Sequence, residues 1–265
     1  MKKVLCINDL SCIGRCSLSV SLPILACQNI EAVPLPTAVY SMHTGYSGHI
    51  SICNDIDQIV QSWNNLKLKF DCIYSGFLKN QIQIQTVKNL IVKFDCPSFI
   101  DPCFADGGQL YDGYDMGYVE HFKSLIVGAD VILPNITEAC FLTGTKFKQG
   151  IDTKRSAEDL AKKLLYIGVK SVVISGVCFD NASMGAVLAS SSGLQYFSHA
   201  KIEGAFSGAG DILSSIFVGQ MTQKKGIEQS LKTALRLTVK ALSLTKNCDF
   251  GINFYGILQD LINLD

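Results

Sequence analysis

Short apolar runs alternate with longer amphipathic segments along most of the chain. The runs at 4–8, 72–77 and 171–177 are a few residues long and mainly apolar, which is typical of strands buried on both faces. The segment at 226–245 carries apolar residues about every third or fourth position, which predicts an amphipathic helix. The segment at 81–94 is also expected to be a helix, although its alternating Ile and Gln residues are locally strand-like. Strands that alternate with helices through short connections predict a three-layer α/β/α fold around a mostly parallel central sheet.

The same pattern predicts the remaining elements. Pro34 and Pro36 place one further strand at a sheet edge or near a strand end, and Pro23 is expected to kink or displace the first helix. We expect the further strands at 32–36, 98–102 and 130–135, and the further helices at 16–30, 55–70, 119–129, 136–144, 156–168, 208–221 and from about 253 onward.

The alternation of strands and helices changes in the second half of the chain. Two runs at 184–190 and 194–200 flank the turn residues Ser191–Gly193, which predicts an antiparallel hairpin near 184–199 attached to an otherwise parallel sheet. No linker or low-complexity segment interrupts the sequence. We therefore expect a single domain over residues 1–265.

Composition narrows the class of protein. Of 265 residues 48% are apolar and 17% are charged, and the formal net charge is zero. This balance excludes a disordered chain and lacks the basic footprint of a nucleic-acid binder or of a protein held at an anionic membrane. The eleven cysteines are scattered without a C-x-x-C pair, so we expect reduced, mostly buried thiols in the cytoplasm.

Polar residues follow the expected strands. Each alone is an ordinary cap or turn residue, but the carboxyl ends of parallel strands meet at one sheet edge, where α/β proteins bind ligands. The residues at these ends are Asn8–Asp9, Thr37, Ser75–Gly76, Asp101–Pro102, Pro134–Asn135 and Ser175–Gly176.

The segment Ser207–Asp211 (SGAGD) consists of small residues, two of them glycine, followed by one aspartate. Two glycines allow a close backbone approach, and an apolar run after Asp211 fits a helix whose unpaired N–H groups form an anion site. A carboxylate repels phosphate, so an Asp beside such a cradle indicates proton abstraction from an attacking hydroxyl. The alternative is a first-turn Asp that is stabilised by its helix dipole, and the local pattern leaves both open.

A cation site is indicated further along the chain. Asn135 and Glu138 are three residues apart and place an amide and a carboxylate toward one cation, or they form an N-cap and its capping-box partner. Mg²⁺ needs few carboxylates, which fits Glu138 with Asp101 or Asp106. Walker A and Rossmann glycine motifs are absent, and no lysine lies near Asp211 in the sequence, so metal ions and backbone would have to neutralise a triphosphate.

Four motifs in order resemble one family: "INDLSCIGRCSL", "AVYSMHTGYSGH", "LPNITEACFLTG" and "GAGD". Together they are similar to the ribokinase-like vitamin kinases, in particular the bacterial branch of the pyridoxal/pyridoxamine kinases. The similarity runs from Val4 to beyond Leu242. It implies ATP-dependent phosphorylation of the 5′-hydroxymethyl group of a B6 vitamer (pyridoxal, pyridoxamine or pyridoxine).

The resemblance also implies roles for individual residues. Asp211 would be the catalytic base, and the amides of Gly208, Ala209 and Gly210 would form the anion hole. Glu138 would hold Mg²⁺ through water. The other nucleotide-side residues would be Asp101 near the metal and triphosphate, Asn135 near the phosphates and Ser175 at a nucleotide phosphate.

On the vitamin side, the resemblance places five residues around the ring: Asn8, Ser11, Thr37, His43 and Phe77. Asn8 and Thr37 have an alternative interpretation as loop caps, Phe77 as core and His43 as a turn-stabilising residue. The resemblance also implies a homodimer, and the residues leave open whether K⁺ is required.

Two departures from the family pattern affect these expectations. Ala105 stands where relatives commonly have glycine, which would cost on the order of 1 kcal/mol if that position needs a positive φ. Met42 stands where relatives have asparagine, which leaves a hydrogen bond to the vitamin open. A loop at 41–50 or 103–118 is expected to close over the site and exclude water.

Two other functions stay open at this point. A hydroxymethylpyrimidine kinase of thiamine synthesis has a similar fold and a flat hydroxymethyl substrate. A non-catalytic B6-binding protein is the alternative from another class, although it would not need a base beside an anion hole.

Overall fold

The computed structural model describes residues 1–265 except 44–47, 149–153, 205, 247–248 and 265. The chain forms two compact units. The first unit comprises residues 1–79, 86–97 and 202–265, and the second comprises residues 80–85 and 98–201. The two units are described separately below, and the expectation of one domain over the whole chain stays a prediction.

The sheet of the first unit has the strand order β4-β1-β2-β3. Strands β4, β1 and β2 run parallel, and β3 pairs antiparallel with the end of β2. The four consecutive residues from Val4 to Ile7 are fully buried. Because neighbouring residues of a strand point to opposite faces, both faces of this sheet are covered, which explains the continuous apolar run. The bounds are β1 Lys2–Ile13, β2 Ile30–Met42, β3 Ile50–Ile52 and β4 Cys72–Ser75.

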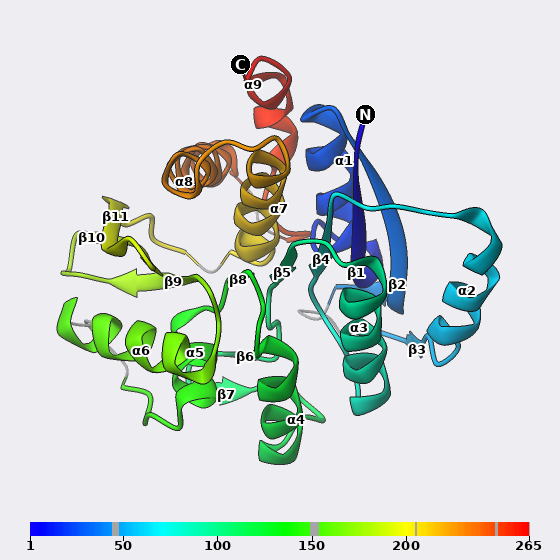
Figure 1. Cartoon of the computed structure of the whole chain (residues 1–265). Helices are drawn as coiled ribbons and strands as arrows, with labels where there is room; N and C mark the ends of the chain where they lie inside the picture. Colours follow the sequence, from blue (N-terminus) through cyan, green and yellow to red (C-terminus); the bar gives the residue numbers. More distant parts are fainter. Residues whose placement is uncertain (44–47, 149–153, 205, 247–248, 265) are drawn as a thin grey trace. The chain divides into compact units, whose positions relative to one another are not determined.

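Helices α1, α7, α8 and α9 of the first unit pack against one another as a connected layer (Figure 1). Helices α2 and α3 come before and after β4 in the sequence. The bounds are α1 Leu18–Cys27, α2 Ile56–Ser62, α3 Gln81–Phe94, α7 Ala209–Thr222, α8 Ile227–Leu244 and α9 Leu258–Ile262, with short 3₁₀ turns η1 at Asn64–Leu66 and η2 at Phe254–Ile257.

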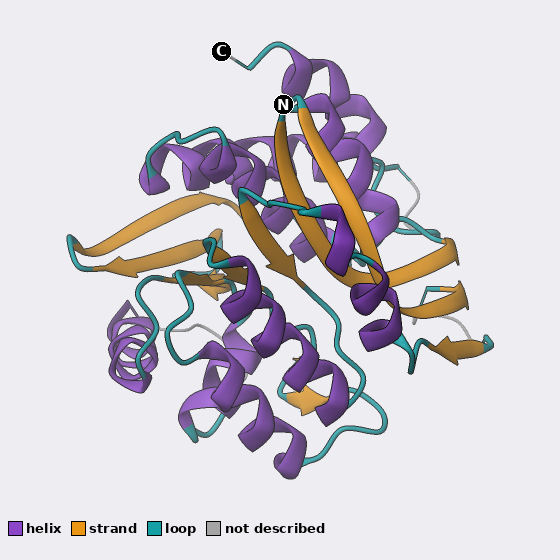
Figure 2. Cartoon of the chain, turned by 45° about the vertical axis from the view of Figure 1, so that its right-hand side comes forward, coloured by secondary structure: helices purple, strands orange, loops and turns teal. Residues whose placement is uncertain are grey.

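The sheet of the second unit has the order β11-β10-β9-β8-β5. Strands β5, β8 and β9 are parallel, whereas β10 and β11 form the antiparallel hairpin that the sequence predicts (Figure 2). The bounds are β5 Ser98–Ile100, β6 Ala105–Asp106, β7 Gln109–Leu110, β8 Val131–Ile132, β9 Val172–Cys178, β10 Ser183–Ser190, β11 Gly193–Ala200, α4 Met116–Ile126, α5 Ile136–Thr143 and α6 Lys154–Ile167.

Several predicted bounds are wrong for identifiable reasons. The strand predicted at 4–8 continues to Ile13 through a register shift. The strand predicted at 171–177 is confirmed as β9 to within one residue, although the polar pair Ser175–Gly176 does not end it, because Gly176 adopts φ 71° at an irregularity in the pairing with β10. The helix predicted at 55–70 ends at Ser62, and Lys67 then adopts the left-handed conformation.

The irregular stretch predicted at 103–118 contains the two-stranded ribbon β6–β7 and the first turn of α4. The edge position predicted for the prolines of β2 is confirmed in the first unit, where β3 pairs only with Ala38–Tyr40. In the described part of the chain, no helix combines the length and the apolar character that crossing a bilayer requires.

Candidate functional site

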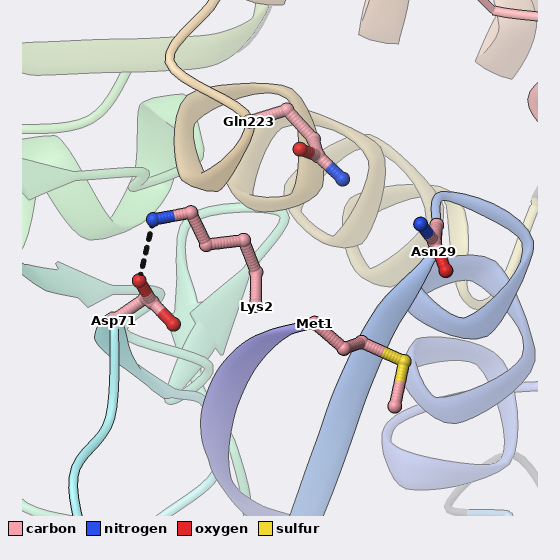
Figure 3. A pocket seen from close by; sticks show the side chains of 5 residues that line it. All are labelled: Met1, Lys2, Asn29, Asp71 and Gln223. Atoms are coloured by element: carbon pink, nitrogen blue, oxygen red, sulfur yellow. Dashed lines mark hydrogen bonds and ion pairs between the residues drawn. The ribbon is translucent and has the colours of Figure 1, made fainter.

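A pocket lies at the amino end of the first unit's sheet, opposite to the edge where the sequence predicts ligands. It measures about 400 Å³ and is lined by Met1, Lys2, Asn29, Asp71 and Gln223. The Lys2 ammonium forms an ion pair with Asp71 at 2.7 Å across it (Figure 3). The chemistry-bearing residues instead form two clusters, one in each unit, which we name after Asp211 and Glu138.

The Asp211 cluster is built on the first turn of α7. Gly208 is the N-cap with φ 87°, and Ile212 donates the first intrahelical hydrogen bond to its carbonyl. The preceding N–H groups of this turn therefore have no partner inside the helix. A Cβ at Gly208 would lie 2.3 Å from the Arg15 carbonyl oxygen, so both the conformation and the packing at this position require glycine.

Asp211 follows on the same turn and is partly exposed. Burial raises the pKa of its carboxyl to about 6, and hydrogen bonds from the Ser17 backbone N–H and the Asn8 side chain lower it in part. A carboxyl with this pKa is mainly ionised at neutral pH and accepts a proton more readily than an ordinary aspartate. The segment thus combines amides that have no partner inside the helix with a carboxylate of raised pKa, and their roles as anion hole and base stay a prediction.

A second carboxylate, which sequence reasoning did not select, belongs to this cluster. Asp9 is 5% exposed. Burial, followed by the charge of Asp211, raises the pKa of its carboxyl to about 7, while hydrogen bonds with Ser17 and Ser11 lower it. The register of β1 against β2 shifts between Asn8 and Leu10, and such irregularities re-aim side chains.

Ser17 connects the two carboxylates. Its hydroxyl group hydrogen-bonds Asp9 and its backbone N–H hydrogen-bonds Asp211. The residue is the N-cap of α1 and adopts φ 52°, a conformation rarely taken by residues other than glycine. Cys16 lies beside it, donates to the Ser11 hydroxyl at 3.2 Å and has its pKa raised to about 12 by burial and by the two carboxylates.

The structure brings Asn8, Thr37 and Phe77 together at the carboxyl ends of neighbouring strands. The Asn8 Oδ1 accepts from the Phe77 backbone N–H at 2.7 Å, and the Thr37 hydroxyl donates to the Phe77 carbonyl at 2.7 Å. The Phe77 ring lies edge-on to Tyr40 with 5.8 Å between centroids. All three predicted residues are buried, so they hold the strand ends in place, and a role in ligand contact stays a prediction.

His43 and Arg15 tie the first loop to the C-terminal segment. The His43 Nε2 lies 3.2 Å from the Asp249 carbonyl oxygen, and its ring covers Gly14. The Arg15 guanidinium donates to the carbonyls of Gly251 and Ile252. These contacts agree with the turn-stabilising interpretation of His43. Part of the loop predicted at 41–50, residues 44–47, lies outside the described residues.

The Glu138 cluster of the second unit begins with a capping box. The Asn135 side chain accepts from the Glu138 N–H, and the Glu138 Oε2 accepts from the Asn135 N–H, both at 2.9 Å. The Glu138 Oε1 also accepts from the Phe104 N–H at 3.0 Å. Glu138 is 2% exposed, and the structure confirms the capping-box interpretation. These backbone donors use most of the acceptor capacity of its two oxygens, so a metal-bound water that donates to a remaining lone pair fits this carboxylate better than direct ligation.

Asp101 adds a second buried carboxylate to this cluster. Burial and then the charge of Asp101 raise the pKa of Glu138, which is the effect of two like charges in a low-dielectric site. Such a pair fits a divalent cation. Among the described side chains no third potential ligand completes a metal cluster, and Mg²⁺ commonly completes its shell with waters and phosphate oxygens. Asp106 is exposed and accepts from the Gly107 N–H.

The strain considered at Ala105 is absent. Ala105 lies in β6 and does not have a positive φ, whereas Cys103, two residues earlier, has φ 48°. The Asn135 Nδ2 donates to the Ala105 carbonyl at 2.7 Å, so alanine is accommodated here. Ser175 pairs with Asn135 through an isolated parallel bridge, which places these two predicted nucleotide-side residues next to each other.

Sequence reasoning missed two residues of the Asp211 cluster, Asp9 and Ser17. A signal for Asp9 existed, because it stands beside the selected Asn8 at a predicted strand end. Ser17 carried no signal beyond its place ahead of a helix, since its positive φ and its contacts depend on residues distant in sequence.

Comparisons with known proteins agree with this fold. The sequence profile of the phosphomethylpyrimidine kinase family matches residues 29–256. The chain is 28% identical to a pyridoxal kinase of Dictyostelium discoideum over 239 residues, which are 82% of this chain and 77% of that protein.

Two solved structures are similar to nearly the whole chain. A protein of Bacteroides thetaiotaomicron, crystallised with pyridoxal and described as a phosphomethylpyrimidine kinase, has a TM-score of 0.92 at 29% identity and covers 98% of this chain and 95% of its own. A pyridoxal kinase of Lactobacillus plantarum has a TM-score of 0.90 at 27% identity, with 99% and 97% covered. These similarities confirm the predicted α/β fold with its mostly parallel sheet.

Proposed function

Because the chain belongs to the phosphomethylpyrimidine kinase family, we propose that it transfers the γ-phosphoryl group of ATP to the 5′-hydroxymethyl group of a B6 vitamer. Two observations support the vitamer as acceptor. The D. discoideum relative is a pyridoxal kinase, and the B. thetaiotaomicron protein was crystallised with pyridoxal.

One observation carries the assignment of the reaction: a partly exposed carboxyl with a pKa of about 6 lies on a helix turn whose first amides have no intrahelical partner. The amides stabilise negative charge on the transferred phosphoryl group. Asp211 accepts the proton of the vitamer hydroxyl as its oxygen attacks the γ-phosphorus. The new O–P bond forms while the bond to the β-phosphate oxygen breaks, and ADP leaves.

The Glu138 cluster would bind the metal ion of the reaction. Glu138 and Asp101 would hold Mg²⁺, Glu138 through water because backbone N–H groups already occupy its oxygens. A bound Mg²⁺ neutralises phosphate charge. Asn135 and Ser175 are the nucleotide-side residues of the proposal. Asn8, Ser11, Thr37, His43 and Phe77 are its vitamin-side residues.

The test measures ATP consumption by the purified protein in Mg²⁺ with each of pyridoxal, pyridoxamine and pyridoxine, beside an Asp211→Asn variant. We expect turnover with a B6 vitamer and a loss of roughly a hundredfold or more in kcat for the variant, with nearly unchanged ATP affinity. Near-normal turnover by Asp211→Asn would show that another group is the base. No turnover with any vitamer would contradict the proposed reaction, and no turnover with hydroxymethylpyrimidine either would favour a non-catalytic binder.

The description of the family favours a second acceptor, hydroxymethylpyrimidine. Both acceptors are flat heteroaromatic rings with a hydroxymethyl group, and both use the same base and anion site. Competition of pyridoxal and hydroxymethylpyrimidine at equal concentration separates them by the ratio of the two phosphorylated products. We further propose that the protein acts in the cytoplasm as a homodimer.

A further inference from the structure

Asp9 is a buried carboxylate beside the proposed base and has no part in the reaction described above. Ser17 contacts both acids, with its hydroxyl on Asp9 and its backbone N–H on Asp211. The two carboxylates are therefore separated by no more than the span of one residue and its two hydrogen bonds. Asp211 lies on the first turn of α7, where the acceptor hydroxyl would meet the anion site.

The cluster has donors but no compensating cation. Ser11, Ser17, Cys16 and Tyr40 surround the acids with neutral groups, and among the described residues no cationic side chain shifts the pKa of either acid. The two basic side chains of the neighbouring loop point elsewhere: Arg15 donates to the carbonyls of Gly251 and Ile252, and the His43 Nε2 lies against the Asp249 carbonyl.

A third buried polar group also lies in this cluster. The Asn8 amide is held through its Oδ1, which accepts from the backbone N–H groups of Asp9 and Phe77. This arrangement directs Nδ2 to the other side, toward Asp211, whose pKa it lowers. Nδ2 is buried, and no hydrogen bond of ordinary length and angle is found for it among the described residues. The two acids, without a compensating cation among the described residues, suit a positively charged ligand, and the Asn8 Nδ2 can donate to a neutral oxygen of such a ligand.

The following inference rests on the proposed function. We propose that Asp9 is a specificity-determining residue, whose carboxylate favours alcohol acceptors that carry a protonated aminomethyl group on the ring carbon adjacent to the one that bears the reacting hydroxymethyl group. Among the B6 vitamers, pyridoxamine has this amine. Pyridoxine has a neutral hydroxyl at the same position and is otherwise the same molecule.

Geometry and charge both support this assignment. Substituents on neighbouring ring carbons lie side by side, so an acceptor with its hydroxymethyl group at Asp211 presents the adjacent substituent to the neighbouring carboxylate. An ammonium there makes a charge-assisted hydrogen bond and replaces the proton that otherwise relieves repulsion between two buried acids. The raised pKa values of Asp9 and Asp211, about 7 and about 6, agree with such a proton.

The experiment measures binding and turnover of pyridoxamine and pyridoxine by the full chain and by Asp9→Asn. Asp9→Ser is a second variant in case the amide disturbs folding, and a thermal melt checks each protein. The matched control is Asp71→Asn, which removes one carboxylate from the same unit. Asp71 pairs with Lys2 and accepts from the Lys3 N–H, about 20 Å along β1 from Asp9.

We expect the wild type to prefer pyridoxamine over pyridoxine at least tenfold in Kd and in kcat/KM. Asp9→Asn should reduce this ratio at least tenfold, mainly by weakening pyridoxamine, and Asp71→Asn should keep the wild-type ratio. If the pyridoxamine-to-pyridoxine ratio of Asp9→Asn and Asp9→Ser stays within twofold of the wild-type ratio, the inference is overturned. Turnover of either vitamer would still support the proposed function in that case. A wild type that neither binds nor phosphorylates a vitamer overturns both.

Discussion

Replacement of Gly208 by alanine tests whether the start of α7 depends on one glycine. The backbone there has φ 87°, and a Cβ would lie 2.3 Å from the Arg15 carbonyl oxygen. The left-handed conformation costs an alanine roughly 1–2 kcal/mol. Carbon and oxygen approach to about 3.3 Å at closest, so the loop must move by about 1 Å, which adds roughly 1–3 kcal/mol of overpacking.

The expected total loss in the free energy of unfolding is about 2–5 kcal/mol. For a chain of this size each kcal/mol corresponds to about 2–4 °C in Tm, so a loss of about 3 kcal/mol lowers Tm by about 6–12 °C. The assay is urea and thermal unfolding followed by circular dichroism. Because the same shift moves the amides of the anion site, kcat should also fall by about a hundredfold.

Gly210 provides the matched control two residues away. It lies inside α7, and a Cβ there would meet nothing within 4 Å. Gly210→Ala should therefore leave stability unchanged or raise it by up to about 1 kcal/mol, since alanine favours a helix more than glycine. Equal melting temperatures for the two variants would refute the steric reasoning, because both make the same chemical change in the same segment.

Three further predictions concern the carboxylates. The pKa of Asp211 is raised to about 6 and that of Asp9 to about 7, so kcat/KM should fall as pH decreases through 7 to 6, and an acid limb below pH 5 would contradict an acid pair of this kind. A carboxyl whose pKa is raised on folding stabilises the protein below its unfolded pKa, and this contribution is lost as pH rises through the folded pKa. The same pair should therefore make the protein less stable at pH 8 than at pH 5. Urea unfolding at both pH values measures this difference. Glu138→Gln should lower the free energy of unfolding by about 1–3 kcal/mol, because an amide NH₂ then faces a backbone N–H of the capping box, and should raise the Mg²⁺ concentration for half-maximal activity. Asp106→Asn, at an exposed position, is its control, and equal melting temperatures for these two variants would contradict the role of the buried hydrogen bonds.

Much of the architecture was readable from local pattern. The apolar run at 4–8 predicted a strand covered on both faces, and Val4 to Ile7 are fully buried. The hairpin near 184–199 and the helix that begins at Ala209 appear as predicted. Periodicity and turn residues report these features because they depend on neighbours within a few positions.

Element ends were less predictable. β1 and β9 continue past the polar residues that were expected to end them. A strand ends where pairing with its neighbour ends, and that neighbour is distant in sequence, so local composition alone did not determine the ends.

For the candidate site, the sequence by itself determined which residues carry chemistry: SGAGD with Asp211, and the Asn135–Glu138 pair, stand in local motifs whose geometry a single helix turn sets. Only the tertiary structure decided their surroundings. The Ser17 backbone N–H hydrogen-bonds Asp211, which lies 194 positions away in the sequence, and the Ser17 hydroxyl hydrogen-bonds Asp9. Burial and neighbouring charge set a pKa, and both arise only when segments far apart in the chain pack together.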